Sequence, residues 1–456
     1  MNYTLNINEY LSKFYKGTKT PTLDAMLFFM EKLGHPEKKI KVVHIAGTNG
    51  KGSTCEMLST VLEKAGYKVG EFMSPHIIRF NERIRINHKE ILDEELEGLL
   101  EIIAPFVNEY NETHEEEVTL FEVETAIALL YFARKECDIV VLETGLGGLY
   151  DCTNIVDPIL SIITSIGYDH MNILGNTLEE IAIQKAGIIK ENSETIYIKH
   201  KSEIDAIIKK TCEEKNNILH LINPKDWTNN QSKEKQKMYG YKEEQDITQK
   251  EQYKINNCKE EYQIFNYKER KNIQINLKGN KQIANACIVL EAIDVLENKG
   301  YMVSDEDLRE GLKTVVHKAR FETIYTNPTI IFDGGHNEDA IKNLKETIKA
   351  HYSNAKKIYI VSILKTKDYK TVIKELMEDK DAIFIFTDGT KVQDEVKCYV
   401  PKEELYKEAL KYKKEKVYMS LLEEAVQNVR KNYKDAVTFV IGSFYTYSEV
   451  TEFLKK

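Results

Sequence analysis

A glycine-rich segment near the N-terminus contains the residue types that bind phosphate. Residues 42–54, VVHIAGTNGKGST, run from an apolar strand into a glycine-rich turn that ends in Lys51, Ser53 and Thr54. Such a turn between a strand and a helix directs backbone N–H groups and the positive helix end at one point, which suits nucleotide phosphates. The spacing is a variant of the P-loop G-x4-G-K-[ST], because Gly52 separates the lysine from the hydroxyls. Since strand, glycines, lysine, hydroxyls and helix occur in order, we favour a phosphate site over a turn that only permits tight packing.

Three polar side chains follow other apolar runs. Ser74 follows YKVGEFM, Glu143 closes DIVVLE, and His170 comes shortly after ILSIITSI. In an open α/β sheet, ligands collect outside the carboxyl ends of the strands. A hydroxyl, a carboxylate and an imidazole near a triphosphate are candidate Mg²⁺ ligands, although imidazole is an unusual ligand for so hard an ion. Taken alone, His170 is typical of a structural histidine, but its place beside Asp169 at a strand end favours a function.

The elements that must position these residues alternate between strands and helices. The continuous apolar runs KVVHIA, DIVVLETG and ILSIITSI are typical of parallel strands that are buried on both faces. Amphipathic patterns predict helices over 53–66 and 118–136. The fold class is therefore α/β, with a doubly wound, mostly parallel sheet.

A chain of 456 residues is too long for one ordinary core and predicts two domains. We place the first at 1–299 and a smaller, Rossmann-like α/β domain at 300–456, with the boundary at Gly300 after a helical pattern. Residues 225–272 are polar, and we interpret them as a surface insertion or an irregular edge hairpin without chemistry. Strands of the second domain are expected within 329–335, 357–364, 381–388 and 436–444.

Composition limits the possible partners. A net charge of −9 argues against a general nucleic-acid or anionic-membrane surface and favours a small charged metabolite. Seven scattered cysteines without a CxxC pair indicate a reducing compartment and packing roles. The N-terminal segment has no apolar signal core, and no run approaches the ~20 apolar residues of a membrane span. We therefore expect a cytoplasmic protein, monomeric by default, without nucleic-acid or membrane partners.

With these residues placed, the sequence resembles the family of folylpolyglutamate synthase and the bifunctional dihydrofolate synthase, within the superfamily of Mur ligases. GTNGKGS alone would indicate only the superfamily, whereas SPHIIRFNERIRIN narrows the resemblance to its folate branch. The resemblance runs through nearly the whole chain except about 200–272. The other matching segments are TLFEVETAIAL, VVLETGLGGLYDCTNIVDP, SIGYDHMNILGNTLEEIAIQKAGIIK, NACIVLEA, ARFE, FDGGHNEDA and IGSFYTYSEV.

The resemblance implies a set of ligands and roles. It implies that the ATP phosphate loop consists of Asn49, Gly50, Lys51, Gly52 and Ser53. It implies further contacts to ATP from Asn285, Arg320 and Asp333. It implies Mg²⁺ bound by Ser74, Glu143 and His170, and a second Mg²⁺ held by His170 with a carbamylated Lys185. Lys51, His170 and Lys185 are then the expected catalytic residues. The glutamate side would be lined by His336, Ser443 and Tyr445, and the pterin side by Thr119, Phe121, Glu122 and Asp151.

Lys185 is unusual for a helical lysine, which is ordinarily a solvated charge. Ile181, Ala182 and Ala186 set an apolar face around it, and Gly187 allows another backbone to approach. Burial there would lower its pKa and leave a neutral amine that can react with CO₂. Carbamylation itself is an expectation from the resemblance.

Two departures from the family pattern stand out. Leu149 replaces the arginine of GLGGR-x-D-x-TN, so any substrate contact of that guanidinium is absent or supplied elsewhere. KARFE replaces PGRFE, which keeps Arg320 but loses the turn-forming Pro-Gly.

The resemblance implies an ATP-dependent ligase that adds L-glutamate to the terminal carboxylate of a folate through an acyl phosphate. Whether dihydropteroate is also a substrate stays open. One alternative is another amino-acid ligase of the superfamily. The other is a nucleotide-dependent regulatory binding protein, against which stand the absence of an N-K-x-D motif and a second domain with DGGHN and GSFY loops.

Overall fold

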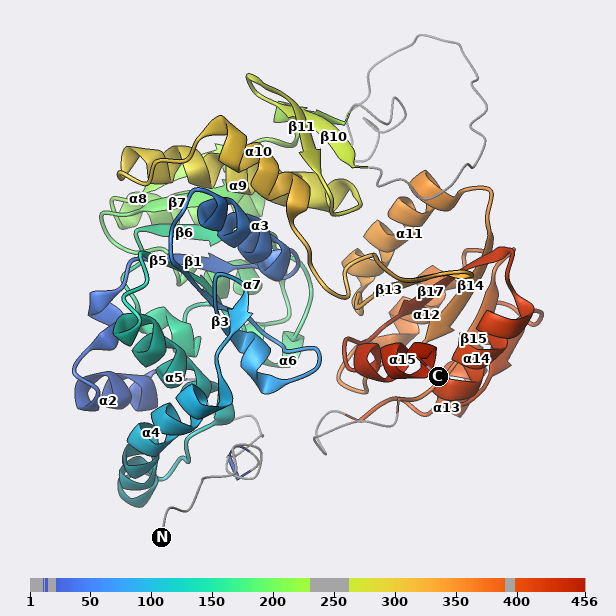
Figure 1. Ribbon diagram of the computed structural model, residues 1–456, viewed down its shortest axis with the longest axis horizontal. Coiled ribbons are helices and arrows are strands. Elements are labelled where there is room, and N and C mark those ends of the chain that lie inside the picture. The colour runs from blue at the N-terminus through green and yellow to red at the C-terminus, as the bar shows by residue number, and fades with distance from the viewer. Residues whose placement is uncertain (1–10, 12, 15–21, 230–261, 390–397, 456) are drawn as a thin grey trace.

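The structure is a computed structural model that describes residues 22–229, 262–389 and 398–455, together with residues 11, 13 and 14. Two α/β units lie side by side in Figure 1, the first coloured blue to yellow and the second orange to red. Both units contain a mainly parallel sheet with helices on its two faces, as the sequence predicts. Within the described residues, none of the helices has the length and apolar character needed to cross a membrane.

The first unit is built on an eight-stranded sheet. Six of its strands run parallel, and β3 and β4 add an antiparallel edge. In spatial order the strands are β4 (Lys89–Glu90), β3 (Ile84–Ile86), β2 (Val69–Phe72), β5 (Ile139–Glu143), β1 (Val42–Ala46), β6 (Leu160–Ile163), β7 (Glu194–Ile198) and β8 (Ile218–Ile222).

Helices cover both faces of this sheet. Side chains of a strand alternate between faces, so Val43 and Ile45 of β1 join one core and Val42 joins the other. The first core contains α3 (Lys51–Lys64) and α9 (Asn280–Asn298). The opposite face is covered by α2 (Asp24–Lys32), α4 (Asp93–Thr113), α5 (Leu120–Arg134), α6 (Met171–Leu174), α7 (Leu178–Ala186) and α8 (Ser202–Glu214). Short 3₁₀ turns occur at Pro36–Lys39, Phe80–Arg83, Cys152–Ile155 and Pro224–Asp226.

Of the two interpretations of residues 225–272, the described part agrees with the edge hairpin. Strands β9 (Trp227–Asn229), β10 (Gln263–Tyr267) and β11 (Arg270–Ile275) form a small antiparallel sheet, and 230–261 lie outside the described residues. Phe265 and Tyr267 alternate with the less buried Ile264 and Asn266 and are buried in the same core as α9. Polar residues between the buried ones lowered the average hydrophobicity of the segment, although its alternation is that of a strand with one buried face.

The second unit has a six-stranded sheet. Ile330 and Ile331 of one strand enter different cores, so this sheet is also buried on both faces. Its order is β12 (Glu322–Thr326), β13 (Thr329–Asp333), β17 (Ala436–Ile441), β14 (Lys356–Val361), β15 (Ile383–Phe386) and β16 (Val417–Met419). One face packs on α11 (Glu338–Tyr352), α12 (Tyr369–Leu376) and α13 (Lys402–Ala409), the other on α14 (Leu422–Asn432) and α15 (Thr446–Lys455).

The core of the first unit extends beyond the boundary predicted at Gly300. Helix α10 (Asp305–Thr314) packs on α3, and its Leu308 and Leu312 belong to the first core. Gly311 makes this close approach possible, because a Cβ there would lie 2.7 Å from the Val61 Cα. Ala319 is the first residue along this segment whose side chain belongs to a core of the second unit. Gly300 marks a helix end, and the sequence pattern does not distinguish a helix end from a domain end.

We expect the β10–β11 hairpin to stabilise the first unit. Replacing Phe265 by Ala should lower the free energy of unfolding by about 3 kcal/mol, because a fully buried ring is lost. Glu269→Ala, at an exposed position of the same hairpin, is the matched control and should change little. The only tryptophan, Trp227, pairs with Tyr267, so its fluorescence during urea unfolding reports on this sheet. Equal unfolding midpoints for the two variants would contradict the assignment.

Candidate active site

The phosphate loop forms as the sequence predicts. It lies between β1, which ends at Ala46, and α3, which begins at Lys51. Gly50 adopts φ = 93°, and a Cβ at this position would lie 2.6 Å from the Asn285 Oδ1. Glycine is therefore required here both by the backbone conformation and by the approach of α9.

The end of β6 holds this loop in place. The Asn49 amide donates to the Ser165 Oγ at 2.9 Å. In return, the hydroxyls of Thr164 and Ser165 each donate to the Asn49 carbonyl at 2.8 Å. Neither hydroxyl residue is among the predicted site residues, although both lie near the end of the apolar run ILSIITSI, at the carboxyl edge where ligands collect.

Glu143 and Lys51 face each other at the start of the loop. Lys51 Nζ lies 3.8 Å from the Glu143 carboxylate and donates to the Gly47 carbonyl at 3.1 Å. The backbone amide of Ser74 donates to Glu143 at 3.2 Å, so the structure brings these two predicted metal ligands together. Burial raises the pKa of Glu143, although Lys51 opposes the shift. A buried carboxylate with so few partners fits a cation.

His170, the third predicted ligand, has other neighbours. It has φ = 49° and precedes α6, with its Nε2 3.2 Å from Lys367 Nζ of the second unit. Lys367 also forms an ion pair with Asp169 at 3.0 Å. Burial and Lys367 lower the pKa of His170 to about 4. A neutral imidazole can bind a metal ion through either ring nitrogen, and Lys367 has to move away only for binding through Nε2.

Lys185 is buried on α7, as its apolar neighbours predict. Its exposed fraction is 2%, and burial, reinforced by Lys51, lowers its pKa to about 7. Gly187 admits the backbone of Leu149, because a Cβ there would overlap the Leu149 Cα. The Leu149 amide donates to the Gln184 carbonyl at 2.7 Å, which fixes this loop without the arginine of the family pattern.

The four residues predicted near a pterin have contacts within the first unit. Thr119 and Glu122 form a capping box at the start of α5. Asp151 is buried and accepts hydrogen bonds from the amides of Leu146 and Thr153. The hydrogen bonds of these three side chains therefore stabilise the start of α5 and the loop around Asp151. Phe121 packs its ring against Gly145, and a substrate contact by any of the four stays a prediction.

The predicted residues of the second unit surround Phe444. Arg320 lies over this ring, with its guanidinium 4.4 Å from the centroid, and His336 meets it edge-on at 5.9 Å. The His336 Nδ1 donates to the Gly334 carbonyl at 2.8 Å. Ser443 precedes the ring in sequence and accepts from the amide of Tyr445, which follows it.

Asp333 closes this group at the end of β13. It accepts hydrogen bonds from the amides of Phe321 and Gly335. Burial raises the pKa of Asp333, opposed by Arg320, and burial lowers the pKa of Arg320, opposed by Asp333 and Glu143. The charge of Arg320 thus interacts with Asp333 in the second unit and with Glu143, a predicted metal ligand, in the first.

The two units meet directly at the phosphate loop. The side-chain amides of Asn49 and Asn337 form two reciprocal hydrogen bonds of 3.3 and 3.2 Å. Asn337 also caps α11 through the amide of Ala340. No sequence pattern predicts the contacts of Lys367 and Asn337 with the first unit, because these contacts depend on how the two units are placed.

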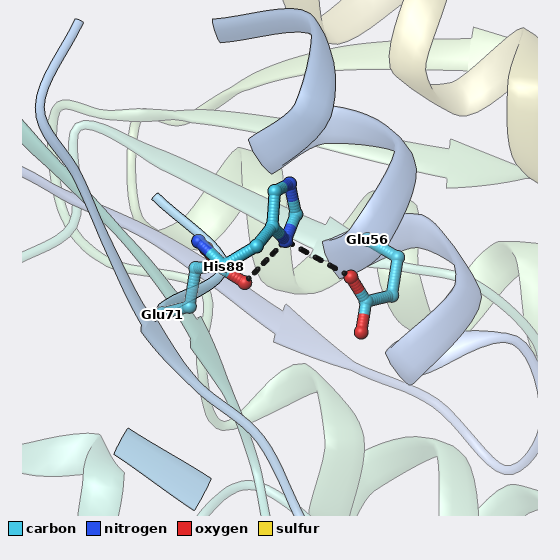
Figure 2. A group of neighbouring side chains, drawn as sticks. All are labelled: Glu56, Glu71 and His88. Atoms are coloured by element: carbon cyan, nitrogen blue, oxygen red, sulfur yellow. Dashed lines mark hydrogen bonds and ion pairs between the residues drawn. The ribbon is translucent and has the colours of Figure 1, made fainter. Parts of the chain in front are cut away.

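A second cluster of ionisable side chains lies behind the loop, against α3. Glu56 of α3, Glu71 of β2 and His88 offer ligand atoms within 4.8 Å of one another. Figure 2 shows the His88 ring between the two carboxylates, with its Nδ1 3.2 and 3.3 Å from them. Arg85 also bonds to both carboxylates, at 2.8 and 2.5 Å.

The charges of this cluster balance without a metal ion. Burial alone would lower the pKa of His88, but hydrogen bonds to Glu56 and Glu71 raise it to about 10. A protonated imidazole and a guanidinium then neutralise two carboxylates. Because a metal ion would have to displace both cations, we interpret the cluster as an ion network that ties α3 to the sheet edge.

Comparison with known proteins agrees with this architecture. The family model described as Mur ligase middle domain matches residues 45–293, and the one described as Dihydrofolate synthetase, C-terminal domain, matches 317–454. Dihydrofolate synthase/folylpolyglutamate synthase of Bacillus subtilis is 39% identical over 359 residues, which cover 78% of each chain. The chain belongs to this family of Mur ligases.

Solved structures of the family share the fold. Folylpolyglutamate synthase of Thermotoga maritima has a TM-score of 0.78 and 29% identity, covering 99% of this chain and 97% of its own. FolC of E. coli, solved in complex with DHPP and ADP, has a TM-score of 0.78 and 26% identity, covering 98% and 96%. The second family match begins at residue 317, near where the structure begins its second core.

The ion network predicts a pH dependence of stability. His88 takes up a proton on folding when the pH lies between its unfolded pKa of 6.5 and its folded value of about 10. Its contribution is therefore complete below 6.5 and is lost as the pH rises towards 10. Between about pH 7 and 9, the wild type should lose about 1 kcal/mol of unfolding free energy per pH unit more than His88→Gln. Urea unfolding followed by Trp227 fluorescence measures both slopes, and parallel slopes would exclude a charged His88.

Proposed function

We propose that this protein is an ATP-dependent ligase that joins L-glutamate to the terminal carboxylate of a folate. The observation that carries the proposal is the phosphate loop, in which Lys51 lies 3.8 Å from the buried Glu143. The family relationship adds its support, since the relatives named above are folylpolyglutamate and dihydrofolate synthases. The second unit contributes Asn337 directly opposite Asn49 of the loop, so both units border the reaction site.

The chemistry explains why a phosphate loop serves a ligase. A carboxylate is a poor electrophile, because its charge is delocalised and hydroxide is a poor leaving group. Transfer of the γ-phosphoryl group of ATP to the folate carboxylate breaks the bond to ADP and gives an acyl phosphate. The neutral amino group of glutamate then attacks the acyl carbon, phosphate leaves, and an amide forms with loss of one proton. Lys51 and the loop amides position the phosphates and neutralise their charge.

Two Mg²⁺ ions fit the residues present. Ser74, Glu143 and His170 would hold one, which the low number of partners around the buried Glu143 carboxylate favours. His170 and a carbamylated Lys185 would hold the second, after Lys367 has moved from the imidazole. Bound Mg²⁺ would supply neutralisation of the phosphate charge in addition to Lys51.

The two units divide the substrates. ATP and folate would bind on the first unit, and glutamate beside His336, Ser443 and Tyr445 of the second. The wall of the pterin site would then be stabilised, more than contacted directly, by Thr119, Phe121, Glu122 and Asp151. Closure of the two units brings acyl phosphate and amine together and excludes the water that would hydrolyse the acyl phosphate. We propose that the protein works as a monomer, since each chain then holds a complete site.

A dihydrofolate synthase activity would use the same chemistry on a different acceptor. The Bacillus subtilis relative carries both activities in its name, and the E. coli structure holds DHPP. Dihydropteroate ends in a carboxylate that the same loop could activate. Only the substrate differs, so turnover must be measured with each acceptor.

We expect ATP turnover to require both an acceptor and L-glutamate. The assay measures ADP and the amide product with tetrahydrofolate and dihydropteroate separately, each with and without glutamate. Lys51→Ala should fold normally and lose at least 100-fold in kcat/KM, because phosphate neutralisation contributes several kcal/mol to the barrier. A protein that hydrolyses ATP without glutamate or product would instead favour a nucleotide-dependent regulator. An amino-acid ligase of another branch would ignore both pterin acceptors.

Lys185 is expected to carry a carbamate. The neutral amine attacks CO₂, a C–N bond forms, and one proton is released, which leaves an anion in place of a buried ammonium. Lys185→Ala should lower kcat by at least 100-fold, and short carboxylic acids such as acetate should restore part of it by occupying the space. Lys190→Ala is the control. Lys190 follows the helix that carries Lys185, and this variant shows whether the added carboxylic acids change activity without filling the space of Lys185. Mass spectrometry and ¹³C spectra with labelled bicarbonate test the modification, and an unmodified amine in active protein would contradict it.

A further inference from the structure

A chain of hydrogen bonds runs behind the phosphate loop and ends on the connection between the two units. Asn285 Nδ2 donates to Gln282 Oε1 at 3.1 Å, and Gln282 Nε2 donates to the Ser53 Oγ at 3.2 Å. The first bond fixes the orientation of the glutamine amide, because its carbonyl must face Asn285. Its NH₂ group therefore faces Ser53, and the serine oxygen acts as an acceptor.

The single proton of Ser53 has one nearby acceptor along this chain. His317 Nδ1 lies 3.1 Å from the Ser53 Oγ. We assign the Ser53 hydroxyl as the donor of this bond, which places the imidazole proton on Nε2. Ser53 is only 3% exposed, so its hydroxyl is turned towards the protein and away from the open side of the loop.

His317 also touches the loop backbone. A Cβ at Gly52 would lie 3.2 Å from His317 Cε1, which places the ring against the residue after Lys51. The histidine belongs to the segment between α10 and β12, where the chain passes from the first unit to the second. Three residues later the same segment supplies Arg320, whose charge interacts with Asp333 and Glu143.

We propose that His317 is a positioning residue for the nucleotide, which acts through Ser53 to hold the phosphate loop against the connection between the units. This inference rests on the proposed function, because it assumes that the loop binds ATP. Since the Ser53 hydroxyl is committed to Gln282 and His317, the phosphates are held by loop amides and Lys51. The same bond fixes where the connecting segment enters the second unit, and so where Arg320 stands relative to the loop.

A matched pair of variants separates hydrogen bonding from packing. His317→Asn keeps an acceptor near the position of Nδ1 with less volume, and His317→Phe keeps a ring against Gly52 without an acceptor. The readouts are the Kd of ADP, measured by calorimetry with and without Mg²⁺, and the KM and kcat values of ligation. Thermal unfolding checks that both variants fold.

His317→Phe should raise the Kd of ADP and the KM for ATP about 10-fold, with glutamate KM unchanged and kcat within about 3-fold. His317→Asn should stay within about 2-fold of the wild type. Ser53→Ala should match His317→Phe, and the double variant should be no weaker than either single variant, because both remove one bond. The comparison of the double variant with the two single variants still tests the proposal if either single variant is less stable than the wild type.

Several results would overturn the proposal. Wild-type affinity in His317→Phe would mean that the ring only fills space. Equal losses in the Asn and Phe variants would assign the effect to packing, and multiplied losses in the double variant would mean that Ser53 and His317 act independently. A wild-type protein that binds neither ADP nor ATP would refute the proposed function as well, whereas normal binding in all variants would refute this inference alone.

Discussion

The buried carboxylate of Glu143 is the constraint on which the site depends. Glu143 ends a strand whose residues are all buried, and its few partners are the Ser74 amide and a lysine 3.8 Å away. A charge in such a place must be compensated, and part of the compensation comes from Lys51, the residue proposed to neutralise the phosphates. Lys51 reaches it because β1 and β5 pair in parallel, with Ile45 opposite Glu143, so both strands end at the same edge.

Helix α3 must therefore be held firmly, since its first residue is Lys51. It is clamped at successive positions along one side. Ser53 bonds to α9 and to the segment between the units, and one turn later Glu56 bonds to Arg85 and approaches His88. The network is costly to assemble from separate charges, but once its charges are balanced it resists movement of the helix relative to the sheet. A rigid loop keeps its amides aimed at one point before the nucleotide arrives, which lowers the entropic cost of binding.

The sequence predicted the parts of the structure that depend on local pattern. The apolar runs around Ile45, Val141 and Ile162 predicted buried strands, and the glycine, lysine and hydroxyl residues predicted the phosphate loop. Both predictions use local properties, namely the hydrophobic periodicity of a segment and the residue types of a turn. It left the segment around Phe265 open between an insertion and a hairpin, because buried residues alternate there with more exposed ones. It was wrong at Gly300, where a helix end resembled a domain end. It also gave no signal for Lys367, Asn337 or His317, whose roles depend on contacts between distant segments. Asp151 and Glu122 were singled out by resemblance, and the structure shows that their carboxylates bind the backbone of their own loops.

The contacts between the units explain how the site can both close and reopen. They are polar near the loop, where Asn337 bonds to Asn49 and Lys367 pairs with Asp169. Polar contacts exchange readily with water, so the two units can separate without exposing an apolar surface there. These same contacts involve two predicted site residues, because Lys367 contacts the His170 Nε2 and Asn337 bonds to the Asn49 side chain. Since Lys367 and Asn337 both belong to the second unit, the domain movement that we propose would release His170 and Asn49 together.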